Sequence, residues 1–218
     1  MMDRPWVIFD MDGTLIDSMP YWDRLTDEYL DQMQLSEKVK TILRYKVQSM
    51  SMLESAALFK EVLDLPHTPV QIELEMGDIM DRHYQEDIPL KPGVKAYLQK
   101  LREQDVAMCV ATLTPVPLAR ACLERLGIAD YFVFILSCDD VGAGKDQPYI
   151  YLQAAWEFGA DPSEVAVFED AHYAARTAKQ AGFWVVGMYD ETHAKHWPEM
   201  QYICDETIQS WDEALQYL

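Results

Sequence analysis

The sequence predicts an α/β protein in which a doubly wound parallel sheet carries an inserted α-helical domain. Short apolar runs alternate with segments of helical periodicity, at residues 6–9, 106–111, 132–136, 165–168 and 184–186. Their continuous apolarity is typical of strands that are buried on both faces of a parallel sheet. A long stretch after the first run has no such strand and carries helical patterns instead. In a sheet built from βαβ units, ligands gather at the carboxyl ends of the strands.

Helices are expected between the predicted strands, at residues 93–103, 117–126, 147–158 and 171–181. Three of these segments run into a glycine, at Gly127, Gly159 and Gly182. A glycine at this place commonly ends a helix, because it takes up the left-handed conformation without strain.

The stretch after the first strand is expected to form a domain of its own. Apolar residues repeat there at helical spacing, at Leu25, Tyr29 and Met33 and again at Leu53, Ala56 and Ala57. We therefore predict a core of residues 1–16 and 89–218 and a helical insertion of residues 17–88. An insertion at this point can act as a lid over the site.

The composition argues against several classes of partner. A formal net charge of −19 at pH 7 repels nucleic acid and anionic membranes. No apolar run approaches the roughly 18 residues that span a bilayer, and the run at 6–9 is too short for a signal peptide. We expect a soluble cytoplasmic protein, monomer or homodimer, with no nucleic-acid or membrane partner. An anionic substrate would need a metal ion or a well-placed lysine in order to enter.

The cysteines are widely spaced and form no CxxC pair, at Cys109, Cys122, Cys138 and Cys204. Two of them lie inside apolar runs, where a free cysteine behaves as a small hydrophobic residue. We expect reduced, structural thiols in place of disulfides or metal ligands.

Two aspartates, Asp10 and Asp12, follow the first predicted strand. Residues i and i+2 of an extended segment point the same way, so both carboxylates can be directed to one point. Two carboxylates that close repel each other unless a cation or a proton intervenes. A hard, oxygen-ligated ion such as Mg2+ resolves this repulsion and can neutralise a phosphate as well. Two solvated turn aspartates are the alternative for this pattern taken alone.

The segment FDMDGTLIDS, residues 9–18, resembles the first motif of the haloacid dehalogenase-like hydrolase superfamily. Three further segments resemble its later motifs in the expected order: Thr112 after the second strand, Lys145 after Gly144, and Glu169-Asp170 after the fourth strand. The resemblance covers essentially the whole chain. The insertion is similar to the helical cap of the phosphoglycolate phosphatase and β-phosphoglucomutase-like subfamily.

This resemblance implies a Mg2+-dependent phosphatase that hydrolyses a small phosphorylated metabolite through an aspartyl-phosphate. Asp10 is implied as the nucleophile and Asp12 as the general acid and base. The hydroxyl of Thr112, the backbone N–H of Leu113 and the ammonium of Lys145 are implied to bind the phosphate. Thr112 and Lys145 are also implied to take part in catalysis.

The resemblance also implies the ligands of the Mg2+ ion. They are Asp10, Asp12 through its main-chain carbonyl, Glu169 and Asp170. Asp170 is expected to bind the ion directly, whereas Glu169 binds it directly or through water. Ala171 and Ala174 replace a serine and a glycine that are common in this loop. Asp146 replaces a proline, and we expect it to be the N-cap of the next helix.

Two residues of the insertion depart from the mutases of this subfamily. Trp22 stands where they have a histidine that assists acid–base chemistry, and Met50 lies near the position of a phosphate-binding arginine. Both departures argue against a β-phosphoglucomutase-like phosphotransferase, which stays an alternative. A non-catalytic relative that binds phosphate compounds is another, although every motif residue is present. Trp22, Met50 and the neighbouring Tyr21 either form an aromatic, soft wall over the site or belong to the core of the insertion.

Overall fold

The computed structural model describes residues 4–47 and 50–217, and the chain forms two compact units. The core unit comprises Met1–Met19 and Ile88–Leu218, and the cap unit comprises Pro20–Asp87. Among the described residues, no helix combines the length and apolar character that a membrane crossing requires.

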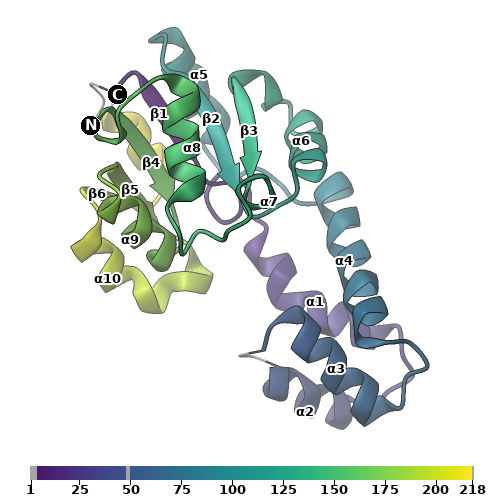
Figure 1. The fold of residues 1–218 in the computed structure, drawn as a ribbon. Coiled ribbons are helices and arrows are strands. Elements are labelled where there is room, and N and C mark those ends of the chain that lie inside the picture. The colour runs from purple at the N-terminus through teal and green to yellow at the C-terminus, as the bar shows by residue number, and fades with distance from the viewer. Residues whose placement is uncertain (1–3, 48–49, 218) are drawn as a thin grey trace. The chain divides into compact units, whose positions relative to one another are not determined.

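One sheet of six parallel strands forms the centre of the core unit (Figure 1). The strands lie in the order β3-β2-β1-β4-β5-β6. Their bounds are β1 Trp6–Phe9, β2 Ala107–Thr112, β3 Phe134–Ser137, β4 Val165–Glu169, β5 Trp184–Met188 and β6 Glu206–Ile208. The predicted fold class is confirmed, and the first five strands correspond to the five predicted runs.

The sixth strand, β6, was not predicted from the sequence. It has three residues, of which only Ile208 is fully buried, and it pairs with β5 alone. An edge strand this short carries no continuous apolar run, so the signal that identified the other strands is missing here.

Helices cover both faces of this sheet (Figure 1). Ile8 of β1 shares one buried cluster with Tyr151 and Met200, which lie on α8 and α10. On the other face, Phe9 stacks on Phe168 with ring centroids 4.9 Å apart, and Trp211 packs against both rings. The core helices are α5 Val94–Glu103, α6 Val116–Arg125, α7 Cys138–Val141, α8 Tyr149–Phe158, α9 His172–Gln180, α10 Trp197–Ile203 and α11 Trp211–Ala214, with short 3-10 turns η1 Ala129–Tyr131, η2 Pro162–Glu164, η3 Glu191–His196 and η4 Leu215–Tyr217.

The three predicted glycines follow the ends of their helices, whereas the predicted start of one helix is wrong. Gly127, Gly159 and Gly182 follow α6, α8 and α9 with positive φ angles, as predicted. Asp146, however, is not the N-cap of α8, whose first residue is Tyr149. The N–H of Gln147 donates to the carbonyl of Gly144 at 3.0 Å, and this extra turn delays the helix. All four cysteines are free thiols, in agreement with their spacing.

The cap unit is entirely helical in its described part. Its helices are α1 Met19–Asp31, α2 Glu37–Val47, α3 Met52–Leu63 and α4 Pro69–Glu86. Ser51 and Glu54 form a capping box at the start of α3, and Thr68 and Gln71 form another at the start of α4. Each box satisfies backbone N–H groups that the first turn of a helix leaves without partners.

The apolar spacing located α1 and α3 of the cap but misplaced three of the six residues that it used. Leu53 and Ala57 are exposed on α3, whose buried residues are Ser55, Ala56 and Phe59. Met33 lies beyond the last residue of α1. Three apolar residues per helix are too few to show which face is buried, because a shift of one residue in the pattern selects a neighbouring face.

His83 joins two cap helices and makes the stability of this unit depend on pH. Its Nε2 lies 2.6 Å from Glu28 on α1, and its Nδ1 lies 2.8 Å from Asp87. Burial opposes the charged ring, but the bonds to Glu28 and Asp87 prevail and raise the pKa of His83. A raised pKa stabilises the fold below the ordinary histidine pKa of about 6.5. This contribution is lost as the pH rises through the folded-state pKa.

We therefore expect amides of α1 and α4 to exchange hydrogen more readily as the pH rises from about 6 to about 8, after correction for intrinsic rates. His83→Gln should remove this pH dependence. His67→Gln, at a half-exposed cap histidine, should retain it. An unchanged pH profile in His83→Gln would contradict the assignment.

Candidate active site

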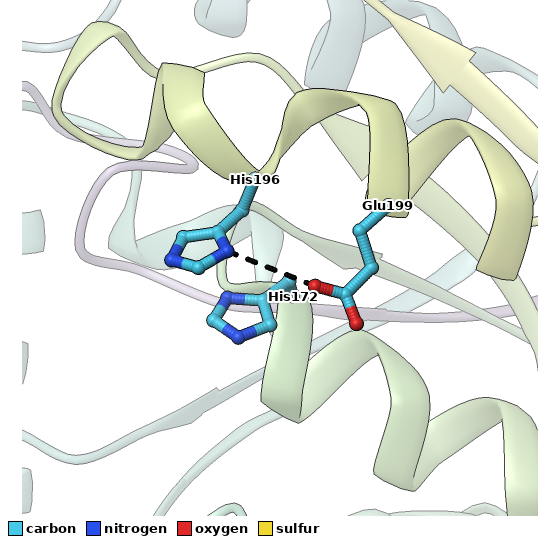
Figure 2. A group of neighbouring side chains, drawn as sticks. All are labelled: His172, His196 and Glu199. Carbon is cyan, nitrogen blue, oxygen red and sulfur yellow. Dashed lines mark ion pairs between the residues drawn. The ribbon is translucent and has the colours of Figure 1, made fainter.

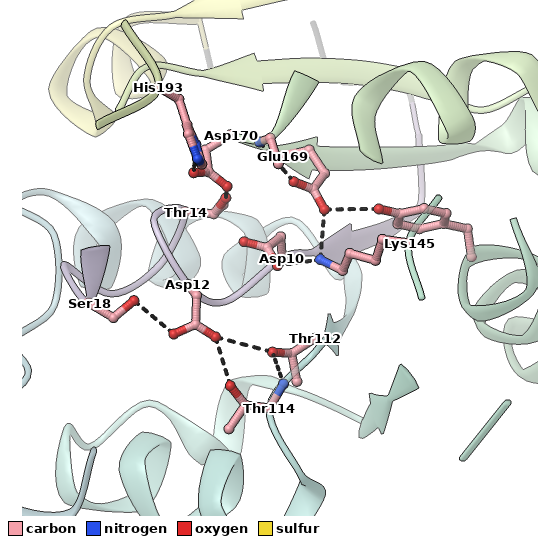
Figure 3. Close-up of polar contacts among 12 residues, drawn as sticks. Asp10, Asp12, Thr14, Ser18, Thr112, Thr114, Lys145, Glu169, Asp170 and His193 are labelled. Atoms are coloured by element: carbon pink, nitrogen blue, oxygen red, sulfur yellow. Dashed lines mark hydrogen bonds and ion pairs between the residues drawn. The ribbon is translucent and has the colours of Figure 1, made fainter. Parts of the chain in front are cut away.

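The candidate site lies where β1, β2 and β4 end. β1 is the neighbour of both other strands, and Phe9 is in register with Val110 and Phe168. The residues that follow therefore meet at one edge of the sheet. Figure 3 shows Asp10, Thr112 and Glu169 at this edge. Chain segments more than a hundred residues apart are brought together by strand pairing alone.

Asp10 is buried, and its two carboxylate oxygens have different surroundings. Oδ1 receives a short ion-paired hydrogen bond from the ammonium of Lys145. Oδ2 is also buried but has no hydrogen-bond partner among the described residues. Burial raises the pKa of Asp10 well above its usual value; Lys145 opposes this rise, and the neighbouring carboxylates add to it. One oxygen is thus held in place while the other lacks the partner that a buried acceptor requires.

Lys145 links two of the predicted carboxylates. Its Nζ lies 2.6 Å from Glu169 Oε1 in addition to its contact with Asp10, and its side chain is only 2% exposed. Burial opposes the ammonium charge, but Asp10 and Glu169 prevail and raise the pKa of Lys145. The lysine therefore stays protonated and offsets negative charge at the centre of the site.

Both oxygens of Glu169 already have protein partners. Oε1 accepts from Lys145 and, at 2.9 Å, from the hydroxyl of Tyr151, while Oε2 accepts from the N–H of Ala171 at 3.2 Å. Burial, followed by the charge of Glu169, raises the pKa of Tyr151 well above its usual value and keeps it a donor. These contacts favour a Glu169 that holds the lysine and reaches a metal through water.

Asp170 is buried beside the first turn of the chain after β1. Its Oδ1 accepts from Thr14 at 3.4 Å, and its Oδ2 lies 2.9 Å from Nδ1 of His193. Burial raises the pKa of Asp170, and the bond to Asp170 raises the pKa of His193. Gly13 has a φ of +80°, and a Cβ at this position would clash with Asp170 Oδ2. A glycine is therefore required at this close approach.

Asp10, Glu169 and Asp170 form an acidic trio in which each side chain offers an oxygen within 4.8 Å of the others. One lysine cannot balance the negative charge of three buried carboxylates. Carboxylate oxygens are the donors that a hard cation prefers. The residues present therefore fit a Mg2+ ion.

The carboxylate of Asp12 is not part of this trio, contrary to the expectation that both aspartates point to one place. Its Oδ1 accepts from Ser18 at 2.7 Å, and its Oδ2 accepts from Thr114 at 2.8 Å and from Thr112 at 3.4 Å (Figure 3). The chain is not extended after Asp10, because the N–H groups of residues 15 and 16 both donate to the carbonyl of residue 11. The turn rotates Asp12 away, so only its main-chain carbonyl stays a predicted metal ligand.

Thr112 and Leu113 lie at the end of β2 and just beyond it. The Thr112 hydroxyl accepts from the N–H of Thr114 at 3.0 Å, in addition to its contact with Asp12. The side chain of Leu113 is 53% exposed and makes no polar contribution. Any phosphate contact at Leu113 would come from its backbone N–H, which stays a prediction.

Four residues of the site were not identified from the sequence as part of it. Ser18 lies within the first motif. Thr114 stands two residues after Thr112, the spacing at which side chains of an extended segment point the same way. The sequence therefore contained an indication for both residues. Tyr151 and His193 reach the site through α8 and η3. Nothing in the order of the residues reveals that these two contact Glu169 and Asp170.

Trp22 and Met50 line a cavity of about 580 Å³ within the cap unit, together with Arg44, Asp23 and two further methionines. Their exposed fractions are 38% and 40%, so neither belongs to the buried core of the cap. Trp22 donates to the hydroxyl of Tyr84 at 3.2 Å. The core interpretation is therefore excluded for both side chains, whereas a wall over the site stays a prediction. Arg44 adds a charged group to the cavity that they line.

Comparison with known proteins identifies a family model and several relatives. Residues 5–182 match the model described as haloacid dehalogenase-like hydrolase. A phosphorylated carbohydrates phosphatase of Thermotoga maritima is 28% identical over 81% of both chains. The fructose-1-phosphate phosphatase YqaB of Escherichia coli is 28% identical over 81% of this chain and 92% of its own. A predicted phosphoglycolate phosphatase of Haemophilus somnus has the same fold, with a TM-score of 0.78, 20% identity, and coverage of 100% and 99%.

Proposed function

Since the chain belongs to the haloacid dehalogenase-like hydrolase family, we propose that it hydrolyses phosphate monoesters with Mg2+ through an aspartyl-phosphate on Asp10. The chain is a phosphatase of small phosphorylated compounds. One observation supports the mechanism through an aspartyl-phosphate: Oδ2 of Asp10 is buried and unpartnered among the described residues, beside Lys145 and the acidic trio.

Asp10 acts as the nucleophile because one of its oxygens is anchored and the other is not. Lys145 holds Oδ1, which leaves Oδ2 to attack phosphorus. A new Oδ2–P bond forms as the bond from phosphorus to the leaving alcohol oxygen breaks. Covalent catalysis of this kind divides one difficult displacement into two easier ones.

Asp12 transfers the proton in both steps. Its carboxylate is oriented by three hydroxyls, those of Ser18, Thr112 and Thr114. Asp12 gives its proton to the leaving oxygen and then takes one from the water that attacks the phosphorylated Asp10. Free phosphate leaves, and both aspartates return to their starting states. Separation of Asp12 from the trio suits this role, because a metal-bound carboxylate is a poor base.

Asp10, Asp170 and the main-chain carbonyl of Asp12 would hold the Mg2+ ion, with Glu169 contacting it through water. The bound ion supplies positive charge to the phosphate oxygens. Lys145 supplies the second positive charge, and the Leu113 N–H donates to the phosphoryl group. The Thr112 hydroxyl, which has one proton, donates to the phosphoryl group by leaving its 3.4 Å contact with Asp12. These donors are placed before the reaction begins, which is the source of their effect.

A phosphate-release screen tests this proposal. We expect the protein to release phosphate from a generic aryl phosphate and from some members of a panel of sugar phosphates and phosphoglycolate. Excess chelator should reduce the rate by at least about 100-fold, since the acidic trio is then left without its cation. Added Mg2+ should restore it, whereas K+ at equal ionic strength should not. Full activity in chelator would exclude the metal-dependent mechanism.

Phosphoryl transfer within a sugar phosphate would give a different product from the same first step. With Trp22 and Met50 in the cap positions where the mutases have histidine and arginine, we expect no interconversion of hexose 1- and 6-phosphates. Phosphorus NMR of a hexose 1-phosphate with the protein and Mg2+ should show free phosphate alone. Appearance of the 6-phosphate would establish mutase activity instead.

A further inference from the structure

We propose that His172, His196 and Glu199 form a second metal site on the core unit, suited to a transition ion such as Zn2+. Each residue offers one ligand atom, and these atoms lie within 4.8 Å of one another. The group shares no residue with the acidic trio. Figure 2 shows the two imidazoles and the carboxylate gathered between α9 and α10.

Three segments of the fold bring these residues together. His172 is the first residue of α9, and His196 is the last residue of η3. Glu199 lies one turn further along, in the first turn of α10. Residues three apart on a helical turn are neighbours on its surface. The pairing of His196 with Glu199 is therefore local, whereas His172 joins them only through the packing of α9 against α10.

The contacts within the group leave one oxygen of Glu199 facing the histidines. The imidazole rings of His172 and His196 stack with centroids 3.8 Å apart and an angle of 15° between planes. Nδ1 of His196 lies 3.7 Å from Oε2 of Glu199. Arg176 forms an ion pair with the other oxygen, Oε1. The guanidinium thereby orients the carboxylate, and Oε2 stays on the side of the imidazoles.

The spacing is close to what a tetrahedral ion requires. Zn–N and Zn–O bonds of about 2.0–2.1 Å place neighbouring ligand atoms about 3.3 Å apart. The pair of His196 and Glu199 is already near this distance. A metal lies in the plane of each imidazole that binds it, so two stacked rings cannot both bind one ion. The side chains of His196 and Glu199 are 31% and 34% exposed, which gives the His196 ring room to rotate.

The donor set differs from that of the acidic trio in its preference for metals. Imidazole nitrogen favours Zn2+, Cu2+ and Ni2+, whereas Mg2+ prefers oxygen. Two histidines and one carboxylate are also a common set for zinc, with water in the fourth position. The trio, which has oxygen donors only, is suited to the hard ion. We therefore expect the two sites to bind different metals when both are offered.

Zinc titration of the intact chain in saturating Mg2+ tests the site. Isothermal titration calorimetry should detect one tight Zn2+ equivalent, and its affinity should fall at least about tenfold in His172→Ala, His196→Ala and Glu199→Gln. His67→Ala, which removes an exposed cap histidine, should leave it unchanged. Arg176→Ala should weaken Zn2+ binding by less than the loss of a ligand does, because it removes only the guanidinium that orients Glu199.

Two further measurements separate this site from the acidic trio. Asp170→Asn should retain the tight Zn2+ equivalent, since Asp170 is not one of the three proposed ligands and its Oδ2 contacts His193 instead. Bound Co2+ should give the strong visible absorption of a tetrahedral ion in the wild type and lose it in His172→Ala. Each variant's thermal unfolding without metal checks that it is folded. Loss of Zn2+ binding in Asp170→Asn, with unchanged binding in the histidine variants, would overturn the proposal.

Discussion

Asp10→Asn should lower the rate of phosphate release by about 10⁴-fold or more, the size of effect seen when a nucleophile is removed. The amide has nearly the shape of the carboxylate but lacks an anionic oxygen to attack phosphorus. Because Lys145 keeps its contact with Glu169, the fold should be retained. Steady-state release of phosphate from an aryl phosphate measures the effect, and circular dichroism checks the fold.

A matched control removes the same charge elsewhere. Asp130→Asn changes an exposed aspartate of η1, and its turnover should equal that of the wild type. Rapid acid quench of the wild type with substrate should trap phosphate on the chain, and mass spectrometry of peptides should locate it on Asp10. A folded Asp10→Asn protein with wild-type turnover would remove Asp10 as the nucleophile.

Lys145→Met should reduce both activity and stability. The variant keeps most of the length of the side chain but leaves Asp10 and Glu169 without the cation that lies between them. Loss of one partner of a buried ion pair costs about 3–5 kcal/mol of unfolding free energy. The loss of a placed charge at a phosphoryl group should lower kcat/KM by about 10²–10³-fold.

The destabilisation of Lys145→Met should depend on pH and on metal. Protonation of Asp10, whose pKa burial already raises, removes the uncompensated charge, so the deficit should shrink as the pH falls. Added Mg2+ should restore part of the stability for the same reason. Urea unfolding at several pH values, with and without Mg2+, measures both effects. Lys95→Met, at an exposed site on α5, should behave as the wild type; equal stability of Lys145→Met would show that the lysine does not balance the site.

The sequence was sufficient for the strands and for most of the residues at the centre of the site. Buried parallel strands require unbroken apolar runs, and β1 to β5 all carry one. Asp10, Thr112 and Glu169 stand at the ends of three such runs. Since parallel strands end at one edge of a sheet, their convergence could be predicted without knowing the strand order. The short edge strand β6 was not predicted because only one of its residues is fully buried.

The direction of individual side chains was decided by the tertiary structure alone. Asp12 turns away from the trio because the chain tightens after Asp10, and the hydroxyls of Ser18 and Thr114 then hold its carboxylate. Tyr151 contacts Glu169 and His193 contacts Asp170, and both lie on helical segments. The apolar pattern of such a segment indicates which residues are buried, but not which residues they contact. The motifs could therefore name the nucleophile and its lysine. Lys145 binds one oxygen of Asp10 and leaves the other for the attack on phosphorus. This difference depends on contacts between residues far apart in the chain, which the local sequence does not reveal.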